Sequence, residues 1–215
     1  MGIGKGKPLL AHTKIDYHEC LCKLILERFF PNRYKDLVLS DKPDLQGDGV
    51  GIEVTSADSE AYREAETNMV KAAYCEDKAQ KAFFAERMKQ LGYEYTEPVQ
   101  VWPSYEPSFK ETKSVVETKI GKLKRGYYKA FPRYELFIYT NMYYDEKVTN
   151  EAKKFFFETL CDRYFMTVYI LSQGTDLHTF EIENGQYSYT EILGGEQHEL
   201  AEKAYQIVVD KENEE

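Results

Sequence analysis

The sequence predicts an α/β fold in which a mixed central β-sheet is flanked by helices. Segments with helical and strand-like patterns alternate along the chain. One stretch, 164–171, is apolar throughout, as a central strand covered on both faces would be. With 215 residues, of which 42% are hydrophobic and 30% charged, the composition is that of a globular protein. We expect one domain over 1–215, with a core at about 12–172 and a C-terminal hairpin plus helix at 176–210.

The first half of the chain begins with an amphipathic helix over 14–30, whose end is marked by Pro31. A short apolar strand should follow, then two strands joined by Gly47-Asp48-Gly49. The hydrophobic pattern then predicts one long helix, closed by Gly92 as a C-cap. The expected strands lie at 36–40, 44–46 and 50–55, and the long helix at 59–91.

The second half follows a proline- and aromatic-rich loop at 93–109, which is long enough to suggest a functional loop. Asn184-Gly185 is the strongest turn signal in the chain and predicts a hairpin. The other expected elements are a helix at 114–128, a strand at 134–140, a phenylalanine-rich helix at 145–163, the strand at 164–171, hairpin strands at 177–183 and 186–192, and a helix at 196–208.

Several classes of protein are disfavoured. No apolar run reaches the ~18 residues that span a bilayer, and the first residues lack the apolar stretch of a secretory signal. We therefore expect a cytoplasmic protein without a membrane partner. The four cysteines and four histidines match neither a zinc pattern nor a disulfide framework.

The charge of the chain is unevenly distributed. The net charge is −9, but residues 110–133 hold eight Lys or Arg and two acids. A concentrated basic segment can attract a polyanion even when the whole protein is acidic. Its alternative is an ordinary solvated helix face. The candidate nucleic-acid contacts are Lys119, Lys122, Lys124, Arg125 and Lys129.

Aromatic residues make up 14% of the chain, and Tyr127-Tyr128 adjoin these lysines. Aromatic side chains interleaved with basic ones can stack on unpaired bases. Core packing or a homodimer interface explains most of the aromatic residues equally well.

The stretch DKPDLQGDGVGIEVTSA, residues 41–57, is where the sequence indicates chemistry most sharply. If Asp48-Gly49 form a two-residue turn, Asp44 lies directly opposite Glu53, with Cβ atoms ~5 Å apart. Leu45 and Ile52 then face the core from the other side of the hairpin. A three-residue turn would offset the acidic pair.

Two carboxylates in this arrangement repel each other by ~4 kcal/mol at ~4 Å and an effective dielectric constant near 20. Full solvation, a shared proton or a bound cation relieves the repulsion. One or two Mg²⁺ ions, held by oxygen ligands, are the usual biological solution. The alternative is an acidic hairpin exposed to solvent.

This segment resembles the PD-(D/E)xK nuclease superfamily. Pro43-Asp44 is followed, after eight residues, by Glu53-Val54-Thr55. The resemblance covers about the first 90 residues and implies a restriction-endonuclease-like fold. It also implies that Asp44 and Glu53 bind Mg²⁺ or Mn²⁺. In this superfamily a lysine two residues after the Glu activates water, and the helix upstream often adds a glutamate.

The chain departs from the motif at its third position, where Thr55 replaces the lysine. Thr55 cannot serve as a cation, so a lysine has migrated from elsewhere or the site is inactive. Lys42 would pair with Thr55 in the hairpin register. Lys71 lies on the long helix after Glu53. Lys119 and Lys122 flank the apolar stripe of the basic helix and could reach over the site.

Glu19 is the candidate third acidic residue, as metal ligand or as water-binding group, with Glu27 behind it. Glu19, Lys23 and Glu27 are spaced i, i+4, i+8 on one helix face, which is also the pattern of a solvated charge ladder. Glu64, early in the long helix, has a similar alternative, because acids favour a helix N-terminus.

Taken together, the residues predict a Mg²⁺-dependent phosphodiesterase acting on DNA. Asp44, Glu53 and Glu19 would form the metal site, and Lys42, Lys119 or Lys122 the catalytic cation. Two alternatives stay open. One is a catalytically inactive nuclease-like module that binds nucleic acid, and the other is a homodimeric protein-interaction domain.

Overall fold

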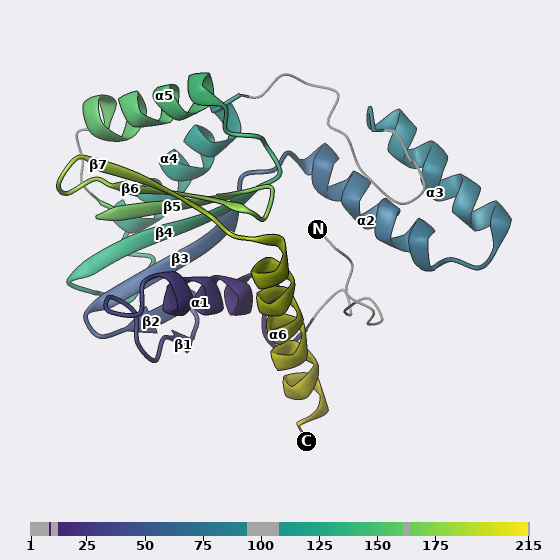
Figure 1. Cartoon of the computed structure of the whole chain (residues 1–215), viewed down its shortest axis with the longest axis horizontal. Coiled ribbons are helices and arrows are strands. Elements are labelled where there is room, and N and C mark those ends of the chain that lie inside the picture. The colour runs from purple at the N-terminus through teal and green to yellow at the C-terminus, as the bar shows by residue number, and fades with distance from the viewer. Residues whose placement is uncertain (1–8, 10–12, 94–107, 161–163, 215) are drawn as a thin grey trace. The chain divides into compact units, whose positions relative to one another are not determined.

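The computed structural model describes residues 9, 13–93, 108–160 and 164–214. The chain divides into two compact units (Figure 1). We call Met1–Ala57 with Phe109–Glu215 the sheet unit, and Asp58–Ser108 the helical unit. The expectation that they form a single domain stays a prediction.

The sheet unit is built on a seven-stranded mixed sheet whose strands lie in chain order, β1 to β7. The first three strands form an antiparallel meander, β3, β4 and β5 are parallel, and β5 to β7 are again antiparallel. The strands are β1 (Val38–Leu39), β2 (Leu45–Gly47), β3 (Val50–Ser56), β4 (Arg133–Thr140), β5 (Thr167–Ser172), β6 (Asp176–Glu181) and β7 (Gln186–Glu191). Every residue of β5 is buried, as its apolar sequence predicts.

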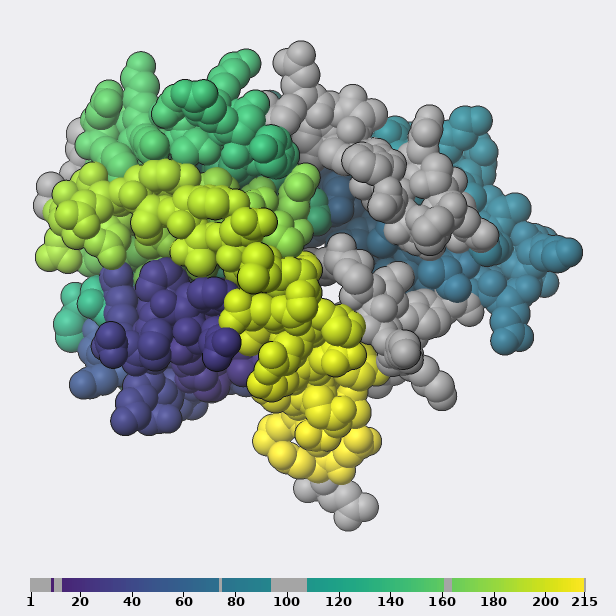
Figure 2. Space-filling view, viewed as in Figure 1, coloured from purple at the N-terminus to yellow at the C-terminus, as the bar shows by residue number. Residues whose placement is uncertain are grey.

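Helices cover both faces of this sheet, which confirms the predicted α/β class. On one face, α1 (Tyr17–Phe29) and α6 (Gly194–Asn213) pack on alternate residues of the strands, such as Phe137 and Tyr169. Figure 2 shows α1 and α6 side by side on the surface of the sheet unit. On the other face, α4 (Lys110–Lys124) and α5 (Glu146–Lys154) cover Leu136 and Ile138. A π-helical segment, η1 (Phe155–Thr159), continues α5.

The helical unit corrects one expectation. The long helix predicted over 59–91 is two helices, α2 (Glu60–Tyr74) and α3 (Lys78–Gln90). The break occurs because Asp77 caps a new helix, its carboxylate accepting from the Gln80 amide. The two helices share a small core that includes Tyr62, Ala65 and Met88. Gly92 follows with φ +87°, as expected of a C-terminal glycine.

Two further expectations concern regions described only in part. Residues 94–107 of the predicted functional loop lie outside the described residues, as do 161–163 at the end of the phenylalanine-rich segment. Within the described ranges, no helix is both long enough and apolar enough to cross a membrane.

Candidate functional site

The hairpin of β2 and β3 has the predicted register. Gly47 pairs with Val50 and Leu45 with Ile52, so Asp48 and Gly49 form the two-residue turn. Gly49 has φ +68°, a conformation that glycine adopts without strain. Asp44, one residue before β2, therefore lies opposite Glu53. Its carboxylate Oδ2 accepts a hydrogen bond of 2.7 Å from the backbone amide of Val54.

A close backbone approach holds this end of the hairpin in place. A Cβ atom at Gly51 would lie 2.6 Å from the Pro43 ring and 2.9 Å from the Phe131 ring. Only glycine allows both rings to pack there, because real Cβ contacts are never that short. Pro43 directly precedes Asp44, so this packing helps to fix the carboxylate.

Glu53 forms an ion pair with a lysine of α4. The Lys119 Nζ of α4 lies 2.5 Å from Glu53 Oε1. Both side chains are largely buried, with 12% of Lys119 and 8% of Glu53 exposed. The second carboxylate oxygen, Glu53 Oε2, is also buried, and the Tyr128 hydroxyl interacts with the same carboxylate.

The charge of Glu53 affects the pKa of Asp44. Burial, and next the negative charge of Glu53, raise the pKa of Asp44 to about 6. The Val54 amide and the Lys119 ammonium act in the opposite direction. The repulsion expected between the paired carboxylates is therefore present, and Lys119 relieves only part of it.

Glu19 lies within electrostatic range of both carboxylates. It is in the first turn of α1, where the Asp16 carboxylate caps the helix by accepting from the amides of His18 and Glu19. Burial, followed by the charges of Asp44, Asp16 and Glu53, raises the pKa of Glu19 to about 8. At neutral pH Glu19 is therefore mostly protonated and donates a hydrogen bond more readily than it binds a cation.

Tyr128 is a site residue that the sequence analysis did not single out by itself. Its side chain is buried, and its hydroxyl is directed at the Glu53 carboxylate. Burial, then the charge of Glu53 and a hydrogen bond with Glu53, raise the pKa of Tyr128, and the charge of Asp44 acts in the same direction. The sequence indicates Tyr128 only through its position directly after the basic helix. Gly126, with φ +66°, sets the chain direction there and so decides that Tyr128, and not Tyr127, is buried.

Lys42 and Lys122, the other lysine candidates of the sheet unit, have contacts other than Glu53. The predicted pairing of Lys42 with Thr55 is wrong, because the chain turns before β2. The Ser40 amide donates to the Asp44 carbonyl, and Lys42 has φ +57°. The Lys42 ammonium lies 3.4 Å from the exposed Asp41 carboxylate. Lys122 lies instead over the ring of Tyr127.

The remaining basic residues lie near the end of α4 or beyond it. Lys124, Arg125 and Lys129 are all exposed, as residues that contact nucleic acid must be. Lys124 lies over the Tyr164 ring and Lys129 over the Phe131 ring. Lys71 belongs to the helical unit, where it lies over the Phe84 ring.

Two of the acidic candidates have structural partners. Glu27 accepts from Lys23 at 2.5 Å and from the Leu37 amide at 2.9 Å, as part of the charge ladder of α1. Glu64 of the helical unit accepts from Arg87 at 2.7 Å.

The described residues contain no group of three or more His, Cys, Asp or Glu side chains positioned to hold a metal ion. The Asp44–Glu53 pair, in which the pKa of Asp44 is raised, is the group that could bind a cation here. Carboxylate oxygens of this kind suit Mg²⁺ or Mn²⁺, with water completing the coordination.

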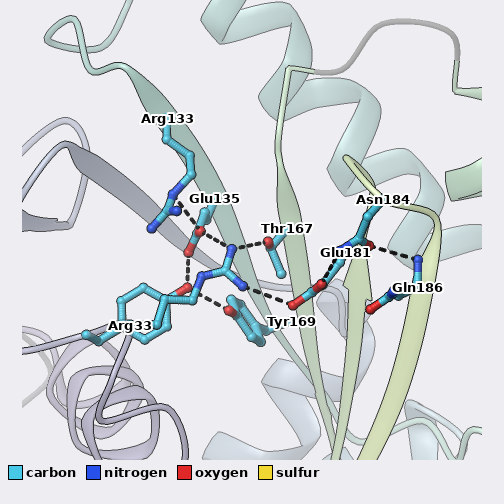
Figure 3. A network of polar contacts seen from close by, with 9 residues as sticks. Arg33, Arg133, Glu135, Thr167, Tyr169, Glu181, Asn184 and Gln186 are labelled. Atoms are coloured by element: carbon cyan, nitrogen blue, oxygen red, sulfur yellow. Dashed lines mark hydrogen bonds and ion pairs between the residues drawn. The ribbon is translucent and has the colours of Figure 1, made fainter.

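A second buried carboxylate lies on the neighbouring strand (Figure 3). Glu135 of β4 is fully buried and lies 2.7 Å from Arg33 Nη2 and 3.1 Å from Arg133 Nε. The Tyr34 hydroxyl donates to its other oxygen and lies 2.6 Å from the Tyr169 hydroxyl. Arg33 also donates to Thr167 and Glu181. We call these residues the Glu135 cluster.

Comparison of the chain with protein-family models, with curated proteins and with solved structures finds no match.

Proposed function

We propose that the chain is a Mg²⁺- or Mn²⁺-dependent phosphodiesterase of the PD-(D/E)xK type, with a restriction-endonuclease-like core, that hydrolyses DNA. The observation that carries this proposal is the 2.5 Å contact between Lys119 and Glu53. The motif lacks its lysine because Thr55 occupies that position. A buried ammonium delivered by α4 to the same glutamate is what a migrated lysine requires.

The arrangement of elements supports the same proposal. In the superfamily that the sequence resembles, the two acids lie on adjacent strands and an upstream helix adds a glutamate. Here Asp44 and Glu53 lie across the β2–β3 hairpin, and α1 carries Glu19. Helix α4 packs through Val116 and Ile120 on the sheet face opposite to α1. Its Lys119 contacts Glu53.

Each side chain then has a distinct role. Asp44 and Glu53 would hold the ion, which when bound supplies a Lewis acid for the phosphate and lowers the pKa of a water. Lys119 orients the attacking water and stabilises negative charge that develops on the phosphate. Glu19, with a pKa of about 8, is suited to hold a water by donating a hydrogen bond. Its proton makes direct ligation the lesser role.

The test is cleavage of plasmid and single-stranded DNA in Mg²⁺ or Mn²⁺. Asp44→Asn and Glu53→Gln should abolish cleavage. Lys119→Met should lower the rate by about 10²- to 10³-fold, the range for loss of one group that stabilises developing negative charge. Lys113→Met is the matched control, because Lys113 is an exposed lysine on the same helix, and it should keep the rate within about threefold. Cleavage that persists in Asp44→Asn with Glu53→Gln excludes the proposal.

A second candidate is a nuclease-like module that binds DNA without cutting it. It is favoured by the lack of a group of three metal-ligating side chains among the described residues. It predicts salt-dependent DNA binding and no nick at stoichiometric protein in either metal ion. The homodimer and the cytoplasmic location stay predictions.

A further inference from the structure

The segment that follows α4 presents two adjacent tyrosines in opposite environments. Gly126, with φ +66°, reverses the chain, and the Tyr127 amide donates to the Lys122 carbonyl. The rings of Tyr127 and Tyr128 are perpendicular, with centroids 5.3 Å apart. Tyr128 is buried beside Glu53, whereas Tyr127 is 48% exposed. The exposed Tyr127 ring therefore directly precedes, in the chain, a tyrosine that contacts the carboxylate site.

Two lysines from different segments flank this exposed ring. The ammonium groups of Lys42 and Lys122 each lie 5.2 Å from the centre of the Tyr127 ring, and Lys42 also hydrogen-bonds the Tyr127 hydroxyl and pairs with Asp41. The two segments are joined directly, because the Lys129 amide donates to the Lys42 carbonyl at 2.9 Å. Lys42 comes two residues before Asp44, and Lys122 three residues after Lys119. The ring and its two cations are thus connected through the backbone to the proposed catalytic residues.

An exposed ring between two ammonium groups suits one kind of ligand. A nucleobase stacks on an aromatic face, and the flanking phosphates attract cations. Arg125 and Lys129 add exposed positive charge in the same segment. A base inside a duplex already has both faces stacked, so only an unpaired nucleotide offers a free face to Tyr127.

We propose that Tyr127, Lys42 and Lys122 form a platform that binds an unpaired nucleotide of single-stranded DNA next to the Asp44–Glu53 site. As a description of the substrate this inference rests on the proposed function, since it places the unpaired nucleotide beside the carboxylates and Lys119. As a binding site it can be tested without any cleavage.

The experiment measures binding of fluorescently labelled (dT)₂₀ and of a 20-base-pair duplex to the full chain in EDTA. Wild-type protein should prefer the single strand. Tyr127→Ala should weaken (dT)₂₀ binding by about 5- to 150-fold, the range for loss of one stacked base, and leave duplex binding unchanged. Tyr127→Phe should lose less (dT)₂₀ affinity than Tyr127→Ala, because it keeps the stacking ring and removes only the hydroxyl that Lys42 contacts.

Matched variants separate stacking from charge and from surface effects. Tyr189→Ala removes a tyrosine that is 50% exposed on β7 and should leave both affinities unchanged. The double variant Lys42→Ala with Lys122→Ala should weaken the binding of both ligands. For the single strand, it should also reduce the slope of log affinity against log salt concentration by about 1.4. An equal loss for both ligands in Tyr127→Ala, or no loss for (dT)₂₀, overturns the platform.

The result is independent of catalysis. A protein that cleaves no DNA but loses (dT)₂₀ affinity in Tyr127→Ala refutes the phosphodiesterase and supports the platform. A protein that cleaves DNA but binds (dT)₂₀ equally well with and without the Tyr127 ring refutes the platform and supports the phosphodiesterase.

Discussion

Glu53 and Glu135 are buried carboxylates on neighbouring strands, but their surroundings differ. They lie on opposite faces of the sheet, because Glu135 pairs with Ile52 and Glu53 with Leu136. Glu135 receives two arginines and a tyrosine hydroxyl, which engage both of its oxygens. Glu53 has a single lysine, the Tyr128 hydroxyl and a carboxylate neighbour in Asp44.

The difference separates a structural carboxylate from a candidate functional one. The Glu135 cluster joins Arg33, which follows α1, to strands β4, β5 and β6 (Figure 3). Its two arginines balance the charges of Glu135 and Glu181 within the protein. Around Asp44 and Glu53, carboxylates outnumber cations, and a bound cation would complete the balance.

The largest expected effect is on the Glu135 side of this comparison. Glu135→Ala should lower the free energy of unfolding by about 3 kcal/mol, because it leaves Arg33 and Arg133 partly buried beside an empty space. Urea denaturation followed by circular dichroism measures the loss. Glu181→Ala is the control, since Glu181 is one-third exposed, and it should cost less than about 1 kcal/mol. A loss below about 1 kcal/mol for Glu135→Ala would mean that the cluster is not structural.

A substitution at Asp44 is expected to stabilise the protein, unlike the substitution at Glu135. In EDTA at pH 8, Asp44→Asn should raise the free energy of unfolding by about 1 kcal/mol, allowing for solvent screening of a partly exposed group. The substitution removes the repulsion from Glu53, and the amide oxygen of Asn can still accept from the Val54 amide. Asp48→Asn, in the exposed turn of the same hairpin, should change stability by less than about 0.5 kcal/mol. If Asp44→Asn instead destabilises the protein, Asp44 is not part of an excess of negative charge.

The sequence was sufficient to predict the Asp44–Glu53 pair because the information is local. Alternating residues fix which face each side chain occupies, and Asp48-Gly49 fixes the turn, so one register follows. Lys42 shows where local reasoning ends. The hairpin register was extended past Asp44, but the chain turns between Ser40 and Asp44 to reach β1.

Positions that depend on packing over long sequence separations were less accessible. Lys119 could be named only as one candidate of several, because its approach to Glu53 depends on how α4 packs through Val116 and Ile120. The Glu135 cluster was not predicted, since Arg33 and Glu135 are about 100 residues apart in the chain. The split of the helix predicted over 59–91 depended on the N-cap at Asp77, which an uninterrupted helical pattern conceals.

An effect no larger than that of Asp44→Asn is expected in the dependence of stability on pH. The pKa of Glu19 is raised from 4.5 to about 8 in the folded protein, so the folded state binds its proton more tightly than the unfolded state does. Stability from this group is therefore complete at low pH and is lost as the pH rises through about 8. Between pH 6.5 and 8.5 in EDTA, the wild type should lose about 1 kcal/mol, a value reduced for a half-buried group.

Variants at the two glutamates of α1 identify the source of this slope. Glu19→Gln should remove it, whereas Glu27→Gln should keep it, because Glu27 is paired with Lys23. Added Mg²⁺ should stabilise the wild type more at pH 8.5 than at pH 6.5, since a cation favours the ionised carboxylates. An unchanged slope in Glu19→Gln would show that Glu19 is not coupled to Asp44 and Glu53. The excess of negative charge would then be limited to the hairpin, and Glu19 would have no part in a metal site.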